Sequence, residues 1–180
     1  MISTYQEALK KFGSRYHIRK ALAEERLFRI SRNQYSNSES YDSLYAIIKR
    51  YPSAIVTGLT AFYIHGLTDV TPQRIDLATK RAGTKIASSQ VTQHFIPEEW
   101  LELGKTTIIY DGTTVPIYDL ERMLLELMRN RNKSPYDVFR EIIAAYRTRA
   151  ESIDIYRLED YARIMPRGKA LLSLIMKEVF

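Results

Sequence analysis

Two basic segments near the start of the sequence contain the side chains best suited to bind a polyanion. In the first, Tyr16, Arg19 and Lys20 fall on one face of a helix, with Arg15 and His17 at its margins. The second carries Arg29, Arg32, Asn33 and Gln34 around a short turn. Arginine and lysine bind phosphate oxygens, and arginine, asparagine and glutamine also read base edges. These residue types predict contact with duplex DNA.

Two short helices must position the first of these segments. Residues 3–12 place apolar side chains at the i, i+3, i+4, i+7 spacing of a helix face, and Gly13 ends that helix. A second helix is predicted over 14–25, with Ser14 as its N-cap. Its buried stripe is expected to consist of Ile18, Ala21 and Leu22.

A basic hairpin is predicted next, with strands at 27–31 and 34–36 and a turn at Arg32-Asn33, where asparagine tolerates the left-handed conformation. Helix, tight turn, helix and hairpin is the order of a winged helix-turn-helix domain. The second helix of such a motif enters the major groove, and the hairpin arginines are then placed to reach phosphates or the minor groove. The alternative is a pair of amphipathic helices whose polar face is only solvated.

The basic excess of the chain is concentrated in this region. Residues 1–40 hold eight Lys and Arg against four Glu, whereas residues 41–180 hold nineteen against seventeen acidic residues. Such asymmetry favours a basic module that faces a polyanion. Ordinary variation of surface charge is the alternative.

Small polar residues at 37–40 predict a linker between two domains. We therefore predict an α+β protein with a winged helix-turn-helix domain at 1–36 and a larger α+β domain at 41–180, whose C-terminal half is helical. The Asp111-Gly112 pair favours a two-residue type I′ hairpin turn. Helices are expected at 41–50, 57–66, 119–128, 134–143, 154–164 and 167–179, and strands at 74–79, 90–96, 106–110 and 113–118.

The residue patterns of catalytic and metal sites are missing from the sequence. No two of the three histidines, His17, His65 and His94, share a helix face, so each is interpreted as a buried or capping residue. Phosphoryl transfer needs two or three converging carboxylates, and Asp76 has no second one two residues later. Glycine-rich phosphate loops and cysteines are also missing. We predict no catalytic residue, no metal ligand and no cofactor, and hence no enzyme.

A second basic surface is suggested in the C-terminal half of the chain. Residues 129–149 carry six cations against two acidic residues. These cations are Arg129, Arg131, Lys133, Arg140, Arg147 and Arg149. They indicate either an ordinary solvated helix face or an electropositive patch for nucleic acid or an acidic partner.

The composition is that of a folded protein. The chain has 180 residues, of which 45% are hydrophobic, and it has a formal net charge of +6 and no cysteine. These values favour a packed core and exclude disulfides. The sequence shows no secretory signal and no apolar run long enough to span a bilayer, so a cytoplasmic protein is expected.

Three segments resemble the AbiEi family of antitoxins, part of AbiE-type abortive-infection toxin–antitoxin systems that confer phage resistance. Residues 51–69, with Gly-Leu-Thr-Ala and His-Gly-Leu, resemble the segment that opens the family's C-terminal domain. Residues 27–35 resemble its winged hairpin, with Asn33 in place of the usual glycine. Residues 115–122 resemble its strand-to-helix junction, where a capping residue precedes an arginine. The resemblance covers nearly the whole chain in order.

This resemblance implies an N-terminal winged helix-turn-helix that binds operator DNA and represses its own operon. The larger domain is implied to neutralise a nucleotidyltransferase-like toxin in a type IV system, in which direct contact between antitoxin and toxin is not required. The expected DNA partner is a double-stranded operator with inverted repeats, bound by two copies of the chain. A full winged domain has one further helix before these two, and the helix at 41–50 is the candidate to cover the core face left open.

Two other classes of function remain open from the sequence. A protein-interaction module would bind a partner through the helices of residues 120–180, without binding DNA. An enzyme acting on nucleic acid is the third interpretation, and it would require further carboxylates around Asp76.

Overall fold

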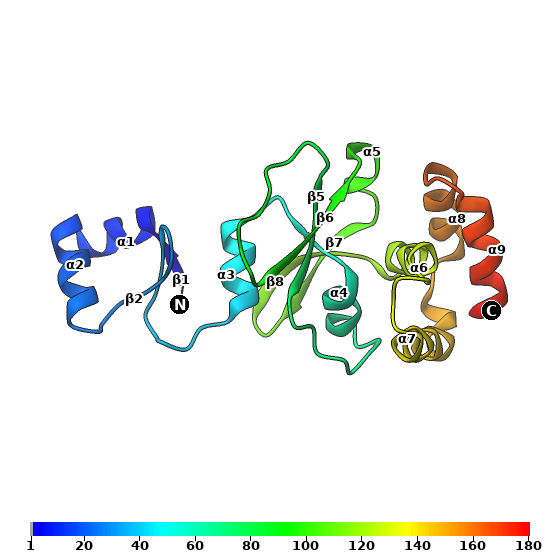
Figure 1. The fold of residues 1–180 in the computed structure, drawn as a ribbon, viewed down its shortest axis with the longest axis horizontal. Helices are drawn as coiled ribbons and strands as arrows, with labels where there is room; N and C mark the ends of the chain where they lie inside the picture. Colours follow the sequence, from blue (N-terminus) through cyan, green and yellow to red (C-terminus); the bar gives the residue numbers. More distant parts are fainter. Residues whose placement is uncertain (1) are drawn as a thin grey trace. The chain divides into compact units, whose positions relative to one another are not determined.

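A computed structural model describes residues 2–180 and shows an α+β fold with two sheets. The chain divides into two compact units, Met1–Pro52 and Ser53–Phe180 (Figure 1). Within the described residues, every helix is too short or too polar to cross a membrane.

The N-terminal unit is built on a three-stranded antiparallel sheet with the strand order β1-β3-β2. Two helices lie between the first and second strands, and a third follows the sheet. The elements are β1 (Ile2–Thr4), α1 (Tyr5–Phe12), α2 (Arg15–Ala23), β2 (Phe28–Ser31), β3 (Gln34–Ser36) and α3 (Ser43–Arg50). The two predicted helices and the hairpin are confirmed, whereas β1 was not predicted from the sequence.

Local signals set the ends of these elements. Thr4 and Glu7 form a reciprocal capping box at the start of α1, where the Thr4 hydroxyl accepts from the Glu7 amide and the Glu7 carboxylate accepts from the Thr4 amide. Gly13, with φ of 78°, ends α1, and the Ser14 side chain caps α2. Asn33 has φ of 64°, so the predicted left-handed turn residue of the hairpin is confirmed.

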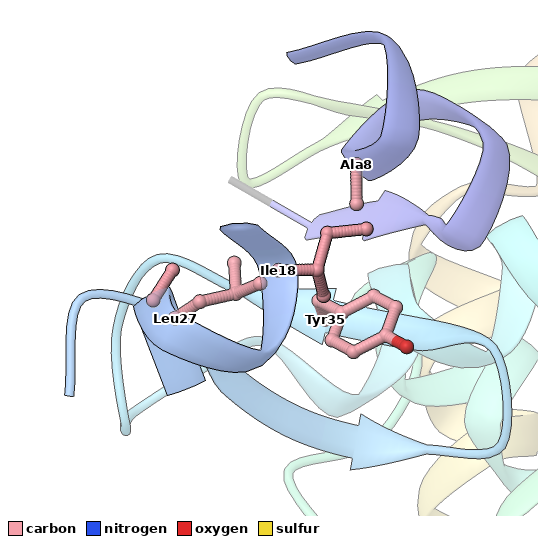
Figure 2. Packing of buried hydrophobic residues seen from close by; sticks show 5 residues of the cluster. Ala8, Ile18, Leu27 and Tyr35 are labelled. Carbon is pink, nitrogen blue, oxygen red and sulfur yellow. The ribbon is translucent and has the colours of Figure 1, made fainter. Parts of the chain in front are cut away.

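The core of the N-terminal unit joins both helices to the hairpin. Figure 2 shows the side chains of Ala8 of α1, Ile18 of α2, Leu27 and Tyr35 of β3 gathered in one cluster, with Ile18 between Ala8 and Tyr35. Ala21 completes the buried cluster. This packing fixes which face of α2 is left for solvent.

The expected domain boundary needs a correction. The helix predicted at 41–50 was assigned to the larger domain, but α3 belongs to the N-terminal unit. The Gln34 side-chain amide donates to the Ala46 carbonyl at 2.8 Å, and the Lys49 ammonium donates to the Ile2 carbonyl at 2.8 Å. Lys49 also pairs with Glu7 at 2.8 Å. These contacts extend the unit to Pro52, so the polar segment at 37–40 is a loop inside it.

The C-terminal unit contains a five-stranded mixed sheet with the order β6-β5-β4-β8-β7. Its central strand pairs antiparallel with β5 and parallel with β8. The elements are β4 (Ile55–Val56), α4 (Gly58–Ile64), β5 (Ile75–Lys80), β6 (Val91–Ile96), α5 (Glu98–Leu101), β7 (Lys105–Tyr110), β8 (Thr113–Tyr118), α6 (Leu120–Arg129), α7 (Tyr136–Thr148), a 3-10 turn (Ala150–Ser152), α8 (Ile155–Ile164) and α9 (Gly168–Glu178).

The hairpin of β7 and β8 matches its prediction closely. Asp111 and Gly112 have φ values of 46° and 73°, and positive φ at both positions is the property of a type I′ turn. Tyr110 pairs with Thr113 across this turn. The short central strand β4 was not predicted.

The helical C-terminal half packs around α6, which contacts α4, α8 and α9 (Figure 1). The junction that opens α6 is tied to the other helices. Asp119 caps α6 and accepts from the Tyr161 hydroxyl of α8 at 2.8 Å. Glu121, which is buried, accepts from the Asp154 amide at 2.8 Å.

Candidate nucleic-acid interface

The amphipathic character of α2 determines which of its side chains face solvent. Ile18 and Ala21 are 2% and 0% exposed and pack into the core. Tyr16 is 70% exposed, and Arg19 and Lys20 are also exposed. The helix therefore presents two cations and a phenol on the side opposite to the core, as the sequence predicts.

The remaining predicted residues of α2 border this face. Arg15 and His17 are exposed. The His17 ring lies edge-on to the Tyr16 ring, with centroids 5.5 Å apart, and its Nδ1 is 3.0 Å from the Ser14 hydroxyl. Because Ser14 also caps the helix, these contacts orient His17 at the first turn.

An acidic residue limits how far the cationic face extends along α2. Lys20 lies 3.8 Å from Glu24, which also pairs with Arg26. The Arg26 guanidinium lowers the pKa of Glu24. Both partners of the Lys20 pair are well exposed, so this pair is weak and leaves Lys20 available to a phosphate.

The hairpin contributes three further exposed polar side chains. Arg29 lies on β2, and Arg32 and Asn33 form the turn. The register between β2 and β3 shifts between Arg29 and Ser31, so the strand has an irregularity next to the turn. Arg29, Arg32 and the cations of α2 belong to one small unit.

Gln34 is a correction to the predicted interface. It was expected to hold the DNA backbone or the minor groove, but it is only 4% exposed. Its amide donates to the Ala46 carbonyl, and its Oε1 accepts from the Ser31 hydroxyl at 2.9 Å. A buried polar side chain with these partners stabilises the unit and cannot contact DNA.

All six cations of the predicted second basic surface are exposed, but several are engaged in contacts within the C-terminal unit. The guanidinium of Arg149 donates to the His65 and Gly66 carbonyls at 2.7 and 2.8 Å. Arg147 donates to the Glu178 carbonyl and pairs with the Glu178 carboxylate at 3.6 Å. These two arginines have structural roles.

The other members of this set are arranged differently. The guanidinium of Arg129 lies 4.8 Å from the Trp100 ring centroid, and that of Arg140 lies 5.8 Å from the Tyr136 ring. Arg131 and Lys133 lie in the segment between α6 and α7. Backbone carbonyls of the unit thus hold two of the six cations, Arg147 and Arg149, and leave the other four available to a ligand.

One polar pair, Asp76 and His94, was not predicted from the sequence. His94 Nε2 lies 2.7 Å from Asp76 Oδ1, and the hydroxyl of Thr60 lies 3.3 Å from the other carboxylate oxygen. Ala78 pairs with His94 in the parallel register of β5 and β6, so Asp76 and His94 share one face of the sheet. Recognising that the two strands are parallel neighbours would have found the pair.

His65 binds a backbone carbonyl and is not part of a metal-binding group of side chains among the described residues. The His65 ring is partly buried and donates through Nε2 to the Tyr118 carbonyl at 2.7 Å. Burial lowers the pKa of His65, so the neutral ring is favoured. Over residues 2–180, no group of three or more His, Asp or Glu side chains is arranged to hold a metal ion.

Comparison with protein-family models and with curated proteins gives no match. Among solved structures, the chain is similar to the crystal structure of the RV2827C protein from Mycobacterium tuberculosis. The TM-score is 0.68 at 15% sequence identity, and the match covers 96% of this chain and 71% of that one. At this identity the likeness concerns the fold.

Proposed function

We propose that the protein is a DNA-binding autorepressor and antitoxin of the AbiEi type, with the N-terminal unit acting as a winged helix-turn-helix. The observation that carries the proposal is the solvent-facing side of α2, where Tyr16, Arg19 and Lys20 stand opposite a packed core. The hairpin of the same unit adds Arg29 and Arg32. A helix with such a face fits the major groove.

In this proposal α2 supplies the base contacts and the hairpin supplies backbone contacts. Arg19 and Lys20 are the candidates for bidentate hydrogen bonds to guanine, and Tyr16 reaches a base edge or a phosphate. Arg32 and Asn33, at the tip of the hairpin, contact phosphates or enter the minor groove. Two copies of the chain bind inverted half-sites, since operator symmetry mirrors that of paired proteins.

The antitoxin role rests on the resemblance of residues 51–69 and 115–122 to the AbiEi family. The first segment contains β4 and α4, and the second contains the end of β8 and the start of α6. The proposed toxin is nucleotidyltransferase-like, and its neutralisation does not require direct contact. The protein is proposed to act in the cytoplasm without catalytic activity or cofactor.

A gel-shift titration with the DNA upstream of the protein's own gene tests the DNA-binding part. Replacing Arg19 or Lys20 with alanine is expected to weaken binding by about 1–3 kcal/mol if the side chain reads a base. Arg163→Ala, on α8, is the matched control and is expected to bind as the unaltered protein does. Unchanged affinity in both α2 variants would contradict the proposal.

A protein-interaction module is the second candidate function. Exposed apolar side chains on the last two helices favour it, because Tyr156 and Ile164 of α8 are 82% and 53% exposed and Met176 of α9 is 43% exposed. Retention of the product of a neighbouring gene, lost in Tyr156→Ser and Ile164→Ser, together with no retention on DNA, would favour this function over the first.

A further inference from the structure

The C-terminal unit contains a solvent-connected cavity of about 730 Å³. It lies among α4, the β5–β6 strands, α5, α6 and α7. Phe62, Met123, Leu127 and Ile142 give it an apolar lining. Small-molecule sites in proteins are concave and mostly apolar, with volumes of roughly 300–1,000 Å³. The cavity therefore has the size and the lining of a ligand site.

The carboxylates that line this cavity already have partners. Glu126 pairs with the buried Arg122 at 2.8 Å and accepts from the Asn130 amide at 3.2 Å. Asp76 accepts from His94 at 2.7 Å, so the imidazole lies on one of its oxygens. Each carboxylate thus already has a neighbouring side chain as its partner.

The cations that line the cavity are free of acidic partners. Across residues 2–180, no carboxylate lies within ion-pair distance of Arg129 or Lys133, and both side chains are exposed. Arg129 is held by its contact with the Trp100 ring, whose indole also lines the cavity. Two cations without acidic partners in the described part of the chain thus lie beside an apolar cavity whose carboxylates already have partners.

We propose that this cavity binds a small amphipathic anion, with an apolar body inside and a carboxylate, sulfonate or phosphate head held by Lys133 and Arg129. Charge complementarity decides the occupant, because a neutral or cationic apolar molecule leaves both cations without partners. This site goes beyond the proposed repressor function and does not depend on it, since none of its residues belongs to the N-terminal unit.

The test uses dodecanoate as the probe, at concentrations below micelle formation. Trp100 is the sole tryptophan and lines the cavity, so its fluorescence reports occupancy directly in the full-length protein. Dodecanoate is expected to bind at least about tenfold more tightly than dodecyltrimethylammonium, which has the same chain and the opposite charge. Calorimetry under the same conditions provides the stoichiometry, which is expected to be one per chain.

Two variants and a matched control localise the binding. Lys133→Glu is expected to weaken dodecanoate about tenfold, because it replaces attraction by repulsion next to the head. Arg131→Glu makes the same charge change two residues away, outside the cavity lining, and is expected to bind like the unaltered protein. Val138→Phe adds volume at the lining and is expected to reduce binding while circular dichroism confirms the fold.

Three outcomes would overturn the proposal. The first is equal affinity for dodecanoate and dodecyltrimethylammonium. The second is an equal loss of dodecanoate affinity in Lys133→Glu and Arg131→Glu. The third is unchanged dodecanoate binding by a folded Val138→Phe variant. The DNA-binding test uses α2 variants and a different readout, so failure of either proposal leaves the other standing.

Discussion

At the scale of single residues, Arg122 of the C-terminal unit is a fully buried cation. It is 0% exposed, donates to the Trp100 carbonyl at 3.1 Å and to Glu126 at 2.8 Å, and lies 4.8 Å from the Tyr118 ring centroid. Its Nε has no acceptor among the described residues. The guanidinium thereby links α5 and α6 to the end of β8.

Arg122→Met is expected to lower the free energy of unfolding by about 3–5 kcal/mol, because the mostly buried Glu126 carboxylate loses its cationic partner and the Trp100 carbonyl loses one of its donors. Urea denaturation followed by circular dichroism measures the change. Arg122→Met combined with Glu126→Leu is expected to recover part of the loss, since the second change removes the unpaired carboxylate.

Arg163 is the matched control for this prediction. It pairs with Glu159 and Asp160 on α8, but its side chain is 70% exposed. Arg163→Met is therefore expected to cost less than about 1 kcal/mol. Equal costs for the two methionine variants would show that burial does not determine the contribution of Arg122.

His65 makes the stability of the C-terminal unit depend on pH. Burial lowers its pKa in the folded state below the ordinary value of 6.5, so the unfolded chain binds more protons as the pH falls through that value. Stability is therefore complete above pH 6.5 and decreases below it, until the lower folded-state pKa is reached. Urea denaturation at pH 7.5 and pH 5.5, followed by Trp100 fluorescence, is expected to show this decrease.

His65→Gln is expected to reduce this pH dependence, because glutamine offers an amide donor to the Tyr118 carbonyl without titrating. The control is His17→Gln, which removes an exposed histidine of the other unit and is expected to leave the dependence unchanged. A pH dependence that survives His65→Gln in full would assign it to another group.

Sequence reasoning about single residues succeeded where periodicity was enough. The helical spacing of α2 predicted that Ile18 and Ala21 are buried and that Arg19 and Lys20 are exposed. It failed for Gln34, whose burial depends on the Ala46 carbonyl, twelve residues away in the chain. A polar side chain with a distant partner looks in sequence like a surface residue.

At the scale of elements, the turn from β4 into α4 depends on a close approach of the backbone to a side chain. Gly58 has φ of 57°, and a Cβ at this position would lie 2.8 Å from the Asp76 Cγ. Gly58→Ala is expected to destabilise the unit by about 2–4 kcal/mol, combining left-handed backbone strain with a clash. Denaturation followed by Trp100 fluorescence measures this change.

Gly112 separates the two causes. Its φ is 73°, but a Cβ there would meet nothing within 4 Å, so Gly112→Ala is expected to cost only about 1–2 kcal/mol of strain. Adding Asp76→Ala to Gly58→Ala removes the contact with the Asp76 Cγ but leaves the Cβ of residue 76 at 2.9 Å, so it should recover only a small part of the loss. If Gly58→Ala costs no more than Gly112→Ala, the close approach has no energetic consequence.

Elements were predictable from sequence when their signals were local. The β7–β8 hairpin follows from Asp111-Gly112, and α2 follows from Ser14 and its apolar stripe. The strand β4 has only two residues, and its pairing with both β5 and β8 is non-local, so no periodicity reveals it. The assignment of α3 to the N-terminal unit likewise depends on contacts of Gln34 and Lys49 that are distant in sequence.

At the scale of the whole molecule, the two basic surfaces differ in how many of their cations are available. The N-terminal unit presents five exposed cations in the proposed interface, namely Arg15, Arg19, Lys20, Arg29 and Arg32. In the segment 129–149, Arg147 and Arg149 are held by backbone carbonyls of their own unit. The electrostatic part of DNA binding is therefore expected to come from the N-terminal unit.

This expectation sets the salt dependence of operator binding. If five phosphates are neutralised, log K is expected to fall with log salt with a slope of about −4 to −5. Each of Arg15→Ala, Arg29→Ala and Arg32→Ala is expected to reduce the magnitude of that slope by about 1 when its cation contacts a phosphate. Fluorescence anisotropy of labelled operator DNA, measured from low to moderate salt, provides the slope.

The double variant Arg131→Ala with Arg140→Ala tests whether the second surface takes part. Both side chains are exposed, neither is held by a carbonyl, and neither lines the cavity, so they are cations of that segment that are free to reach a second stretch of DNA. With contact confined to the N-terminal unit, this double variant keeps the full slope, while the variants at positions 15, 29 and 32 lose part of it. A slope that drops by about 2 in the double variant would instead assign phosphate contacts to the C-terminal unit.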